Sequence, residues 1–400
     1  MALQNNVSMK VLIYFNGFTS VIGGSEFLPL TLAQEFQRRG HEVTFALGYD
    51  SDLALAQRQY GVSLDLAKLG VIVLKPKTRL EKLMNRLFRC AHEWKLQRVA
   101  RQFDLCISTV NPIDFGKPAV HFIYMLGFTT GFRKELGWAE PPVGRNTPLH
   151  RLWRSVSAWV AQHFIVRVRT GDEILSDSRE RVYPNSEWAR QKIEFFFHCQ
   201  TRECFYPPTL SEAGGSSVMR ENVVVSIGRI DAIKRLEVQI EIVEKARQYT
   251  GVDLKFKIAG YIKDDAYGRQ LRQLAAARPW IQLLGPVYGK DKESLLSSAK
   301  WAVHARCGEE FGISVVEYLK HGLIPIVPNA GGAAEVVAHS MLQYGGVDEA
   351  AQKLSQLLRD ETLYKVMLKH CLSRAQYFSA MNYLDRQRQL VDSILEEMGG

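Results

Sequence analysis

The stretch "GEEFGISVVEYLKHG" at residues 308–322 places two glutamates, Glu309 and Glu317, eight positions apart on either side of a Phe-Gly pair. In one continuous α-helix, eight residues correspond to about 800° of rotation, which would leave the two carboxylates about 80° apart. The pattern instead favours a loop that ends at Glu309, a tight backbone at Gly312 and a helix that starts near Ile313. Glu317 then lies just inside that helix and leans back toward its N-terminus. Both carboxylates therefore flank a helix end whose free N–H groups favour an anion.

A helix end with two nearby carboxylates suits a ligand that carries phosphates and hydroxyls together, as a sugar nucleotide does. The surrounding sequence alternates short apolar runs with helical patterns, which predicts a parallel sheet covered by helices on both faces. The predicted elements are strand 222–228, helix 235–247, strand 255–260, helix 266–277, strand 281–285, helix 290–299, strand 301–305, helix 313–321 and strand 324–327.

The N-terminal half shows the same alternation. Residues 9–16, "MKVLIYFN", form a continuous apolar run typical of a strand buried on both faces. An apolar stripe at helical spacing follows, and Gly40 ends that helix. Further strands are expected at 42–47, 69–75, 103–109 and 119–125, and residues 181–193 combine a short strand, a turn and a helix capped by Asn185 or Ser186.

Two doubly wound α/β domains in series are therefore expected, with a ligand in the cleft between them. The Pro-, Gly- and Ser-rich stretch "YPPTLSEAGGSS" at 206–217 is the predicted linker. It separates an N-terminal domain, 1–205, from a C-terminal domain, 218–375, and a last helix in 376–400 is expected to pack back on the N-terminal domain.

The composition is that of a soluble globular protein, with 400 residues, 46% hydrophobic and 23% charged. No run of 18 apolar residues suggests a membrane span, and the N-terminal apolar stretch resembles a first strand more than a signal peptide. The six cysteines are scattered without a C-x-x-C pair, so reduced thiols, a cytoplasmic location and neither a disulfide nor a zinc site are expected. The net charge of +9 indicates an anionic partner.

Four segments, in order along the chain, resemble motifs of the retaining glycosyltransferases of family 4, which have the GT-B fold of two facing Rossmann-like domains. They are "GGSEFLPLTLAQEFQRRGHEV" (23–43), the pair "YPNSEWARQKI" (183–193) and "CFYPP" (204–208), "SIGRIDAIKRLEVQIE" (226–241) and "EEFGISVVEYLKHGLIPIVPNAGG" (309–332). The resemblance implies that the N-terminal domain binds an acceptor and the C-terminal domain a nucleotide sugar.

The resemblance also implies roles for the two acids. Glu309 would hydrogen-bond hydroxyls of the donor sugar and stabilise an oxocarbenium-like transition state. Glu317 would accept hydrogen bonds from the ribose hydroxyls. Eight-residue spacing selects Glu309 over its neighbour Glu310. The alternatives are an ordinary acidic residue before a helix for Glu309 and a solvated helix acid for Glu317, although a lone glutamate in the apolar "ISVVEYL" would be costly to bury.

The remaining site residues are expected to bind the diphosphate and the base of the donor. Arg229 and Lys234 follow a buried strand, where two cations would stabilise a departing diphosphate without a metal; the alternative is a pair of surface cations. Gly23 and Gly24 would let the backbone approach the same diphosphate, or simply form a turn. The resemblance places the base at Val287 and includes the loop and helix start around Gly312 in the donor site, as Phe311, Gly312, Ile313 and Ser314.

Two features are ambiguous. The family often has a histidine in an "H-x-P" strand ending that contacts the donor sugar, but this sequence has "KPAVHFIYMLG", so either His121 or Tyr124 occupies that place, and His121 could equally be a core histidine. The "DSD" at 50–52 has the Asp-x-Asp spacing of a metal site in another glycosyltransferase fold. It lacks the partners of such a site and is interpreted as a surface turn, so no essential metal and no cofactor are expected.

The resemblance implies transfer of a hexose from an α-linked donor, GDP-mannose or a UDP-sugar, with retained anomeric configuration. The expected acceptor is a glycan, a glycolipid or a lipopolysaccharide-type molecule. A hydrolase-like mechanism would need two closely spaced carboxylates, one a nucleophile, so front-face displacement is expected instead. Two alternatives stay open, a sugar-nucleotide epimerase of the same architecture and a non-catalytic sugar-nucleotide-binding protein.

A basic run at 75–101 suggests peripheral docking on anionic lipid. Leu80, Leu83, Leu87, Cys90 and Trp94 fall at helical spacing, and the alternative is a surface helix packed on its own domain. No nucleic-acid motif appears. The cations are Lys75, Lys77, Arg79, Lys82, Arg86, Arg89, Lys95, Arg98 and Arg101.

Overall fold

A computed structural model describes residues 8–18, 25–75, 91–127, 168–209 and 220–399. The chain forms two compact units. Unit 1 comprises residues 1–207 and 384–400, and unit 2 comprises residues 208–383. Gly23 and Gly24 and most of the predicted linker at 206–217 lie outside the described residues.

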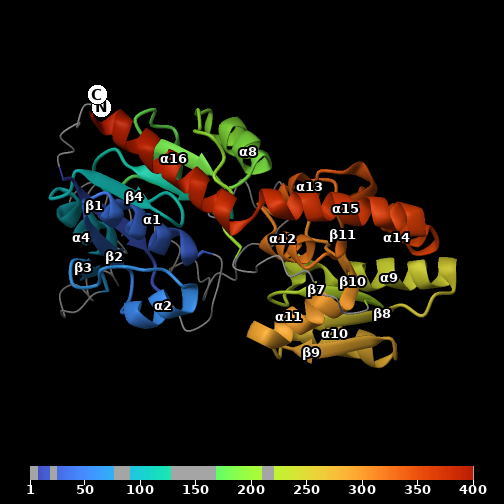
Figure 1. The fold of residues 1–400 in the computed structure, drawn as a ribbon. Coiled ribbons are helices and arrows are strands. Elements are labelled where there is room, and N and C mark those ends of the chain that lie inside the picture. The colour runs from blue at the N-terminus through green and yellow to red at the C-terminus, as the bar shows by residue number, and fades with distance from the viewer. Residues whose placement is uncertain (1–7, 19–24, 76–90, 128–167, 210–219, 400) are drawn as a thin grey trace, which may run out of the picture. The chain divides into compact units, whose positions relative to one another are not determined.

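Unit 1 contains a parallel sheet of six strands among its described residues, in the order β3-β2-β1-β4-β5-β6 (Figure 1). Its strands are β1 (Lys10–Phe15), β2 (Glu42–Leu47), β3 (Gly70–Val73), β4 (Leu105–Ser108), β5 (Val120–Ile123) and β6 (Arg181–Pro184). Its helices are α1 (Phe27–Arg38), α2 (Leu53–Tyr60), α4 (Ala91–Ala100), α7 (Gly171–Leu175) and α8 (Glu187–Phe197). Ser186, one of the two expected caps, caps α8 by accepting from the N–H of Ala189 at 3.0 Å.

Unit 2 repeats this plan, with the order β12-β11-β10-β7-β8-β9. Its strands are β7 (Glu221–Ile227), β8 (Lys255–Ala259), β9 (Ile281–Gly285), β10 (Ala299–Val303), β11 (Ile324–Pro328) and β12 (Gln343–Tyr344). Its helices are η2 (Ala232–Lys234), α9 (Leu236–Thr250), α10 (Ala266–Ala276), α11 (Gly289–Ser298), α12 (Ile313–Lys320), α13 (Gly332–Val337), η3 (Ser340–Leu342), α14 (Val347–Arg359) and α15 (Glu361–Tyr377). The two sheets confirm the predicted pair of doubly wound α/β domains.

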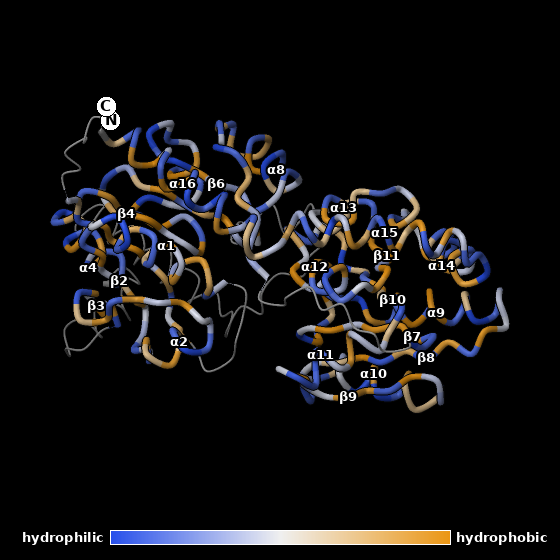
Figure 2. Tube along the Cα trace, viewed as in Figure 1, coloured by the Kyte–Doolittle hydropathy of each residue, from blue (hydrophilic) through white to orange (hydrophobic). Residues whose placement is uncertain are grey.

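The continuous apolar runs are strands buried on both faces. Val11, Leu12 and Ile13 of β1 have no exposed surface, and β7 is buried in the same way at Val224 and Val225. Figure 2 shows apolar residues gathered along the strands of each sheet. Because helices cover both faces of a parallel sheet, its strands carry apolar residues at consecutive positions rather than alternate ones.

The order of the strands locates a binding edge in each unit. In a sheet of this order the strand connections reverse direction between the first and fourth strands, and ligands bind outside the carboxyl ends of the strands at that point. The two strands are β1 and β4 in unit 1, and β7 and β10 in unit 2. The loops that follow β7 and β10 are therefore expected to meet at a ligand.

The last helix, α16 (Ala380–Gly399), carries the chain from unit 2 back into unit 1. Gln387 donates to the hydroxyl of Thr31 at 2.7 Å, and Glu397 accepts from Arg181 at 2.6 Å and from Arg202 at 3.0 Å. The expected boundary at 375/376 lies eight residues before the observed one at 383/384. The intervening residues stay in unit 2 because Phe378 packs edge-on against Phe311.

The basic run is described only from residue 91 onward, since 76–90 lie outside the described residues. Trp94, expected on the apolar stripe, is 38% exposed, and the guanidinium of Arg98 lies 4.9 Å from its ring centroid. Leu96 and Ala100 form the buried side of α4 instead. The predicted stripe through Leu80, Leu83, Leu87, Cys90 and Trp94 stays a prediction, because of these residues only Trp94 is among those described. No helix among the described residues is long and apolar enough to cross a membrane.

Candidate functional site

The loops after β7 and β10 meet at the carboxyl edge of the unit 2 sheet. Parallel pairing of Val224 with Trp301 aligns the two strands, so both loops start at the same level. Across them, Nζ of Lys234 donates to Oε2 of Glu309 at 2.8 Å. Two residues that the sequence places 75 positions apart thus form one ion pair at the predicted binding edge.

The loop before α12 has the backbone that the sequence indicates. Gly312 has a φ of 99°, which a residue with a side chain rarely adopts, and α12 starts at Ile313. At Gly332 a Cβ would lie 2.3 Å from the carbonyl oxygen of Glu310, so only glycine lets α13 approach this loop. The N–H of Gly332 donates to the carbonyl of Glu309 at 2.7 Å. Glycines on both sides therefore fix the backbone that carries Glu309.

Helix α12 is tied to the strand beneath the site. The hydroxyl of Tyr318, fully buried, accepts from the backbone N–H of Ile227 at 2.9 Å. Ile313 and Ser314 are the first residues of α12, so their N–H groups belong to the unsatisfied first turn of a helix. The ring of Phe311, expected among the donor contacts, is buried against Phe378. Only its backbone is placed to contribute to the site.

Glu309 is surrounded by positive charge. Besides Lys234, Nη1 of Arg306 donates to its Oε1 at 3.1 Å, and Nε2 of His304 lies 3.3 Å from its Oε2, without hydrogen-bond alignment. Burial by itself raises the pKa of Glu309, but Lys234, His304 and Arg306 outweigh that cost and hold the pKa well below its usual range. Glu309 is therefore an anion at neutral pH. Burial lowers the pKa of His304, which leaves that imidazole neutral.

Glu317 lies one turn into α12, on the side of α11. Its Oε1 accepts from Nζ of Lys292 at 2.7 Å. The carboxylate is mostly covered, so the ion pair explains how a glutamate is tolerated in an otherwise apolar stretch. Val287, half-buried, follows β9 just before α11 starts. Lys292 thus ties Glu317 to α11, the helix that begins two residues after Val287.

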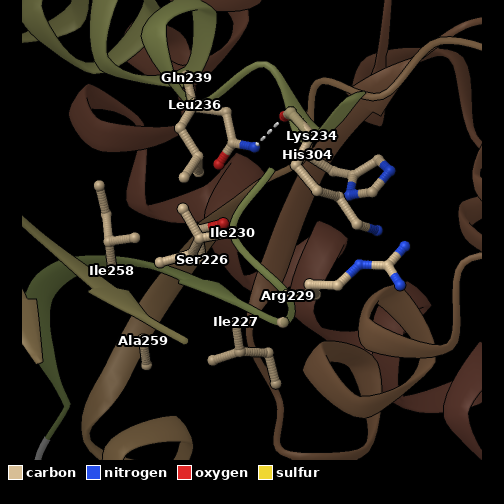
Figure 3. Close-up of a pocket in the computed structure, with 11 residues that line it drawn as sticks. Ser226, Ile227, Arg229, Ile230, Lys234, Leu236, Gln239, Ile258, Ala259 and His304 are labelled. Atoms are coloured by element: carbon tan, nitrogen blue, oxygen red, sulfur yellow. Dashed lines mark hydrogen bonds between the residues drawn. The ribbon is translucent and has the colours of Figure 1, made fainter. Parts of the chain in front are cut away.

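Arg229 is the most open of the predicted cations. Its side chain is 70% exposed and its Nε donates to Asp231 at 2.7 Å. Figure 3 shows the nitrogen-bearing ends of Arg229, Lys234 and His304 gathered on one side of the pocket at the end of β7. The arrangement presents cations and neutral N–H donors, which is the chemistry that an anionic phosphate ligand requires.

His121 lies elsewhere. It is fully buried in the amino-terminal half of β5, and its Nε2 is 3.0 Å from Oε2 of Glu180, also fully buried. Tyr124 instead follows the last residue of β5, at the carboxyl end, and is only half-buried. In this structure His121 is a core histidine, and of the two candidates Tyr124 stands at the binding edge of its sheet.

The Asp-x-Asp pair has a local role. Asp52 caps α2 by accepting from the N–H of Leu55 at 2.8 Å, whereas Asp50 is exposed. Within the described part of the chain, no group of three or more His, Cys, Asp and Glu side chains is placed to hold a metal ion.

Three residues that the sequence did not single out belong to the cluster, namely Lys292, His304 and Arg306. Lys292 comes from α11, which only the fold brings to Glu317, whereas His304 directly follows β10 in the same loop as Glu309. Arg306 had a visible signal, since it stands three residues before Glu309 and four before Glu310, and it pairs with both.

Part of the chain matches a known protein family. Residues 212–371 match the family model described as glycosyl transferases group 1. A curated relative, the GDP-Man:Man(3)GlcNAc(2)-PP-Dol alpha-1,2-mannosyltransferase of Dictyostelium discoideum, is 23% identical over 193 residues. That match covers 44% of this chain and 38% of the relative, so the chain aligns with well under half of the relative's length.

Solved structures align over nearly the whole chain. Anabaena HepE, solved with UDP and glucose, has a TM-score of 0.64 at 17% identity over 96% of this chain and 100% of its own. WaaG, a glycosyltransferase involved in lipopolysaccharide biosynthesis, has a TM-score of 0.63 at 12% identity over 95% of this chain and 99% of its own. Sucrose-phosphate synthase of Thermosynechococcus elongatus has a TM-score of 0.64 at 15% identity over 97% and 100%. At these identities the likeness shows the fold alone, which is GT-B.

Proposed function

We propose that this chain is a glycosyltransferase that moves a hexose from a nucleotide sugar to a glycan or lipid-linked acceptor with retention of configuration. The match of residues 212–371 to the glycosyl transferases group 1 model supports the proposal. The observation that carries this proposal is the Lys234–Glu309 ion pair at the carboxyl ends of β7 and β10. It brings together Lys234, which would stabilise the leaving phosphate, and Glu309, which would bind the sugar. Both lie where sheets of this fold bind ligands.

The donor would lie along the carboxyl edge of unit 2. Its diphosphate would accept from the first turn of α12 at Ile313 and Ser314 and from Lys234 and Arg229. Glu317 would accept hydrogen bonds from the ribose hydroxyls, and the backbone near Val287 would hold the base. This placement uses each predicted site residue in unit 2 that lies on this edge.

The chemistry follows from these positions. As the bond from the anomeric carbon to the phosphate oxygen breaks, negative charge grows on the diphosphate, and Lys234 and Arg229 stabilise it. Glu309, held as an anion, stabilises positive charge on the sugar ring. The acceptor hydroxyl attacks from the side of the departing phosphate, which takes its proton. Neither Glu309 nor Glu317 needs to be a covalent nucleophile, because the acceptor hydroxyl attacks the anomeric carbon directly.

Two donors are the leading candidates. The curated relative is named for GDP-mannose, and HepE has been solved in complex with UDP-glucose. The names of the same relatives, which refer to a lipid-linked glycan and to lipopolysaccharide biosynthesis, support an acceptor of that class. The proposed reaction requires no metal, because side-chain cations face the leaving group.

The decisive experiment pairs binding with turnover. A thermal-shift panel of nucleoside diphosphates and their sugars identifies the donor, and release of nucleoside diphosphate is then measured with and without candidate acceptors. Acceptor-dependent release is expected. Interconversion of two nucleotide sugars without acceptor would indicate an epimerase, and tight binding without any turnover would indicate a non-catalytic binding protein.

Peripheral membrane contact through the basic run at 75–101 remains part of the proposal. The exposed Trp94, with Arg98 beside its ring, offers an amphipathic contact for a lipid surface. Cosedimentation with vesicles containing about 30% anionic lipid is expected to decrease in Trp94→Ala and in Arg98→Glu. Equal cosedimentation with neutral vesicles would contradict it.

A further inference from the structure

Arg306 is the one residue of the described cluster that joins both acids of the loop after β10. Its Nη1 donates to Oε1 of Glu309 at 3.1 Å and its Nη2 donates to Oε2 of Glu310 at 2.7 Å. Its side chain is 14% exposed, and none of the proposed donor contacts uses it. A guanidinium can bridge two carboxylates in this way because its N–H groups form a rigid fork, whereas an ammonium acts as a single point charge.

Lys234 has two tasks in the proposed reaction, and they compete. In this structure its ammonium faces Glu309, yet the proposed reaction asks it to face a diphosphate that carries two or more negative charges. If Lys234 turned to the diphosphate with nothing else beside Glu309, the acid would be a poorly compensated, mostly covered anion, which is costly. The hydroxyls of the donor sugar can donate to Glu309 but bring no positive charge, so a second cation is needed beside that carboxylate when donor binds.

The groups facing Glu309 leave one candidate for that task. His304, from the end of β10, is held neutral by burial, so it can donate a hydrogen bond but brings no charge. Arg229 pairs with Asp231 and Arg235 contacts the sulfur of Cys307 at 3.4 Å, so neither touches Glu309. Glu310, the adjacent acid, anchors the other end of Arg306.

We propose that Arg306 is a positioning residue that holds the carboxylate of Glu309 in place once Lys234 turns to the diphosphate of the donor. Arg306 itself never contacts donor or acceptor; it acts through Glu309, with Glu310 as its second anchor. This inference rests on the proposed function, because it requires a donor diphosphate to which Lys234 can turn while Arg306 stays on Glu309.

The test compares Arg306→Met with wild type in three measurements. At saturating donor, kcat is expected to fall by about 10–100-fold. The acid limb of the kcat–pH profile is expected to move to higher pH by about 1–3 units, since an opposite charge at this distance favours the ionised form of a carboxyl group. The affinity for the bare nucleoside diphosphate, from calorimetry, is expected to stay within about threefold because Lys234 is intact. An acid limb at the wild-type pH would overturn the proposal.

Three further variants separate this role from a structural one. Arg306→Lys keeps a positive charge but loses the fork of N–H groups. Its acid limb is therefore expected to lie close to the wild-type pH while kcat stays below the wild-type value. This variant also replaces Arg306→Met in the test if the methionine variant does not fold. Arg235→Met, the matched control, removes a nearby arginine that does not touch Glu309 and is expected to leave the profile unchanged. Glu310→Gln is expected to leave the acid limb in place, and a shift there as large as in Arg306→Met would show that Glu310 is the acid that matters, which would also overturn the proposal.

Failure of the inference is distinguishable from failure of the proposed function. If wild-type protein releases no nucleoside diphosphate with any donor and acceptor, the proposed function itself fails. If wild type turns over while Arg306→Met behaves like Arg235→Met, only the role of Arg306 is lost.

Discussion

Each unit of this protein contains a covered glutamate beside a histidine and an arginine, at opposite edges of two sheets with the same strand order. In unit 1, Glu180 accepts from the N–H of Ala119 at 2.7 Å, from Arg169 at 2.7 Å, and contacts His121 at 3.0 Å. Ala119 and Glu180 directly precede β5 and β6, so this network lies at the amino ends of the strands. In unit 2, Glu309 follows β10 and lies at the carboxyl ends.

The difference between the two edges decides what each network can do. Arg169 pairs with three carboxylates, those of Asp114, Asp177 and Glu180, and Glu180 also accepts from a backbone N–H. The groups of this network therefore bind one another rather than a ligand. At Glu309 two cations, Lys234 and Arg306, meet on one carboxylate, next to the first turn of α12 and the exposed Arg229, and Arg306 also pairs with Glu310. The same three residue types thus stabilise a fold at one edge and offer a binding site at the other.

The largest expected effect tests the unit 1 network. Glu180→Gln removes a fully buried charge that pairs with Arg169, so the free energy of unfolding is expected to fall by about 3 kcal/mol, the low end for a broken buried ion pair, because Asp114 and Asp177 still pair with Arg169. Denaturant unfolding measures it, and the turnover of the folded fraction should match that of wild type. A loss of turnover without a loss of stability would mean that this network also serves the reaction.

The second effect tests the site. Glu309→Gln is expected to lower transfer by about 10²-fold or more, equivalent to about 2.7 kcal/mol, because the amide offers no charge to the sugar. Calorimetry should show nearly unchanged affinity for the bare diphosphate. If diphosphate binding weakens as much as transfer does, Glu309 faces the phosphates and the sugar has been misplaced.

Glu317 should behave in the opposite way. Glu317→Ala is expected to weaken the nucleoside diphosphate by about 1–3 kcal/mol, the range for hydrogen bonds to a charged group. Lys292→Met is the matched control, because it removes the ion-pair partner and leaves the carboxylate for ribose. The assignment to ribose would be lost if both variants bind the diphosphate as tightly as wild type.

A smaller effect concerns pH and unit 1. A hydrogen bond from Arg179 lowers the pKa of Asp177 to about 2, and Arg169 adds to the shift. Because the folded pKa is depressed, the contribution of Asp177 to stability is present above its unfolded pKa, near 3.9. It is lost as the pH falls through about 2. At pH 7 the free energy of unfolding of wild type should exceed that of Asp177→Asn by less than about 1 kcal/mol. Denaturant unfolding at a series of pH values should show this difference disappearing between about pH 4 and 2. A gap that stays constant over this range would contradict the assignment.

The smallest expected effect is that of chelation. Excess EDTA should leave transfer unchanged, because Lys234 and Arg229 face the leaving group in place of a metal. Complete loss of activity, restored by Mn²⁺, would revive the Asp-x-Asp pair at 50–52 as a metal site.

Local patterns in the sequence were enough for the fold. The runs at β1 and β7 are apolar at every position because both sheet faces are covered, and Gly312 followed by an apolar helix start marks α12 within a residue. The alternation of strands and helices predicts that each sheet is parallel and covered on both faces, whereas the order of the strands comes only from the structure. In each case the signal lies within a few residues of the element that it predicts.

The sequence indicated individual residues of the site but not the contacts between them. Spacing identified Glu309 and Lys234 separately, but their ion pair depends on the register of β7 against β10, which no local pattern encodes. The sequence could not choose between His121 and Tyr124, because a histidine in a strand gives the same local pattern at either end of that strand. The actual partner of His121, Glu180, is 59 residues away, and only the pairing of β5 with β6 brings them together.

The return of α16 into unit 1 has a consequence for biosynthesis. Leu390, Val391 and Ile394 are buried, yet this segment is translated only after residues 208–383, a delay of roughly 10–35 s at typical elongation rates. Until then, the surface of unit 1 that α16 covers is exposed, including the part of α1 where Thr31 accepts from Gln387 in the complete fold. The first half of the chain is therefore expected to complete its folding only after α16 has been made. Shortening the C-terminus before Leu384 should destabilise unit 1 rather than unit 2, which precedes it in sequence.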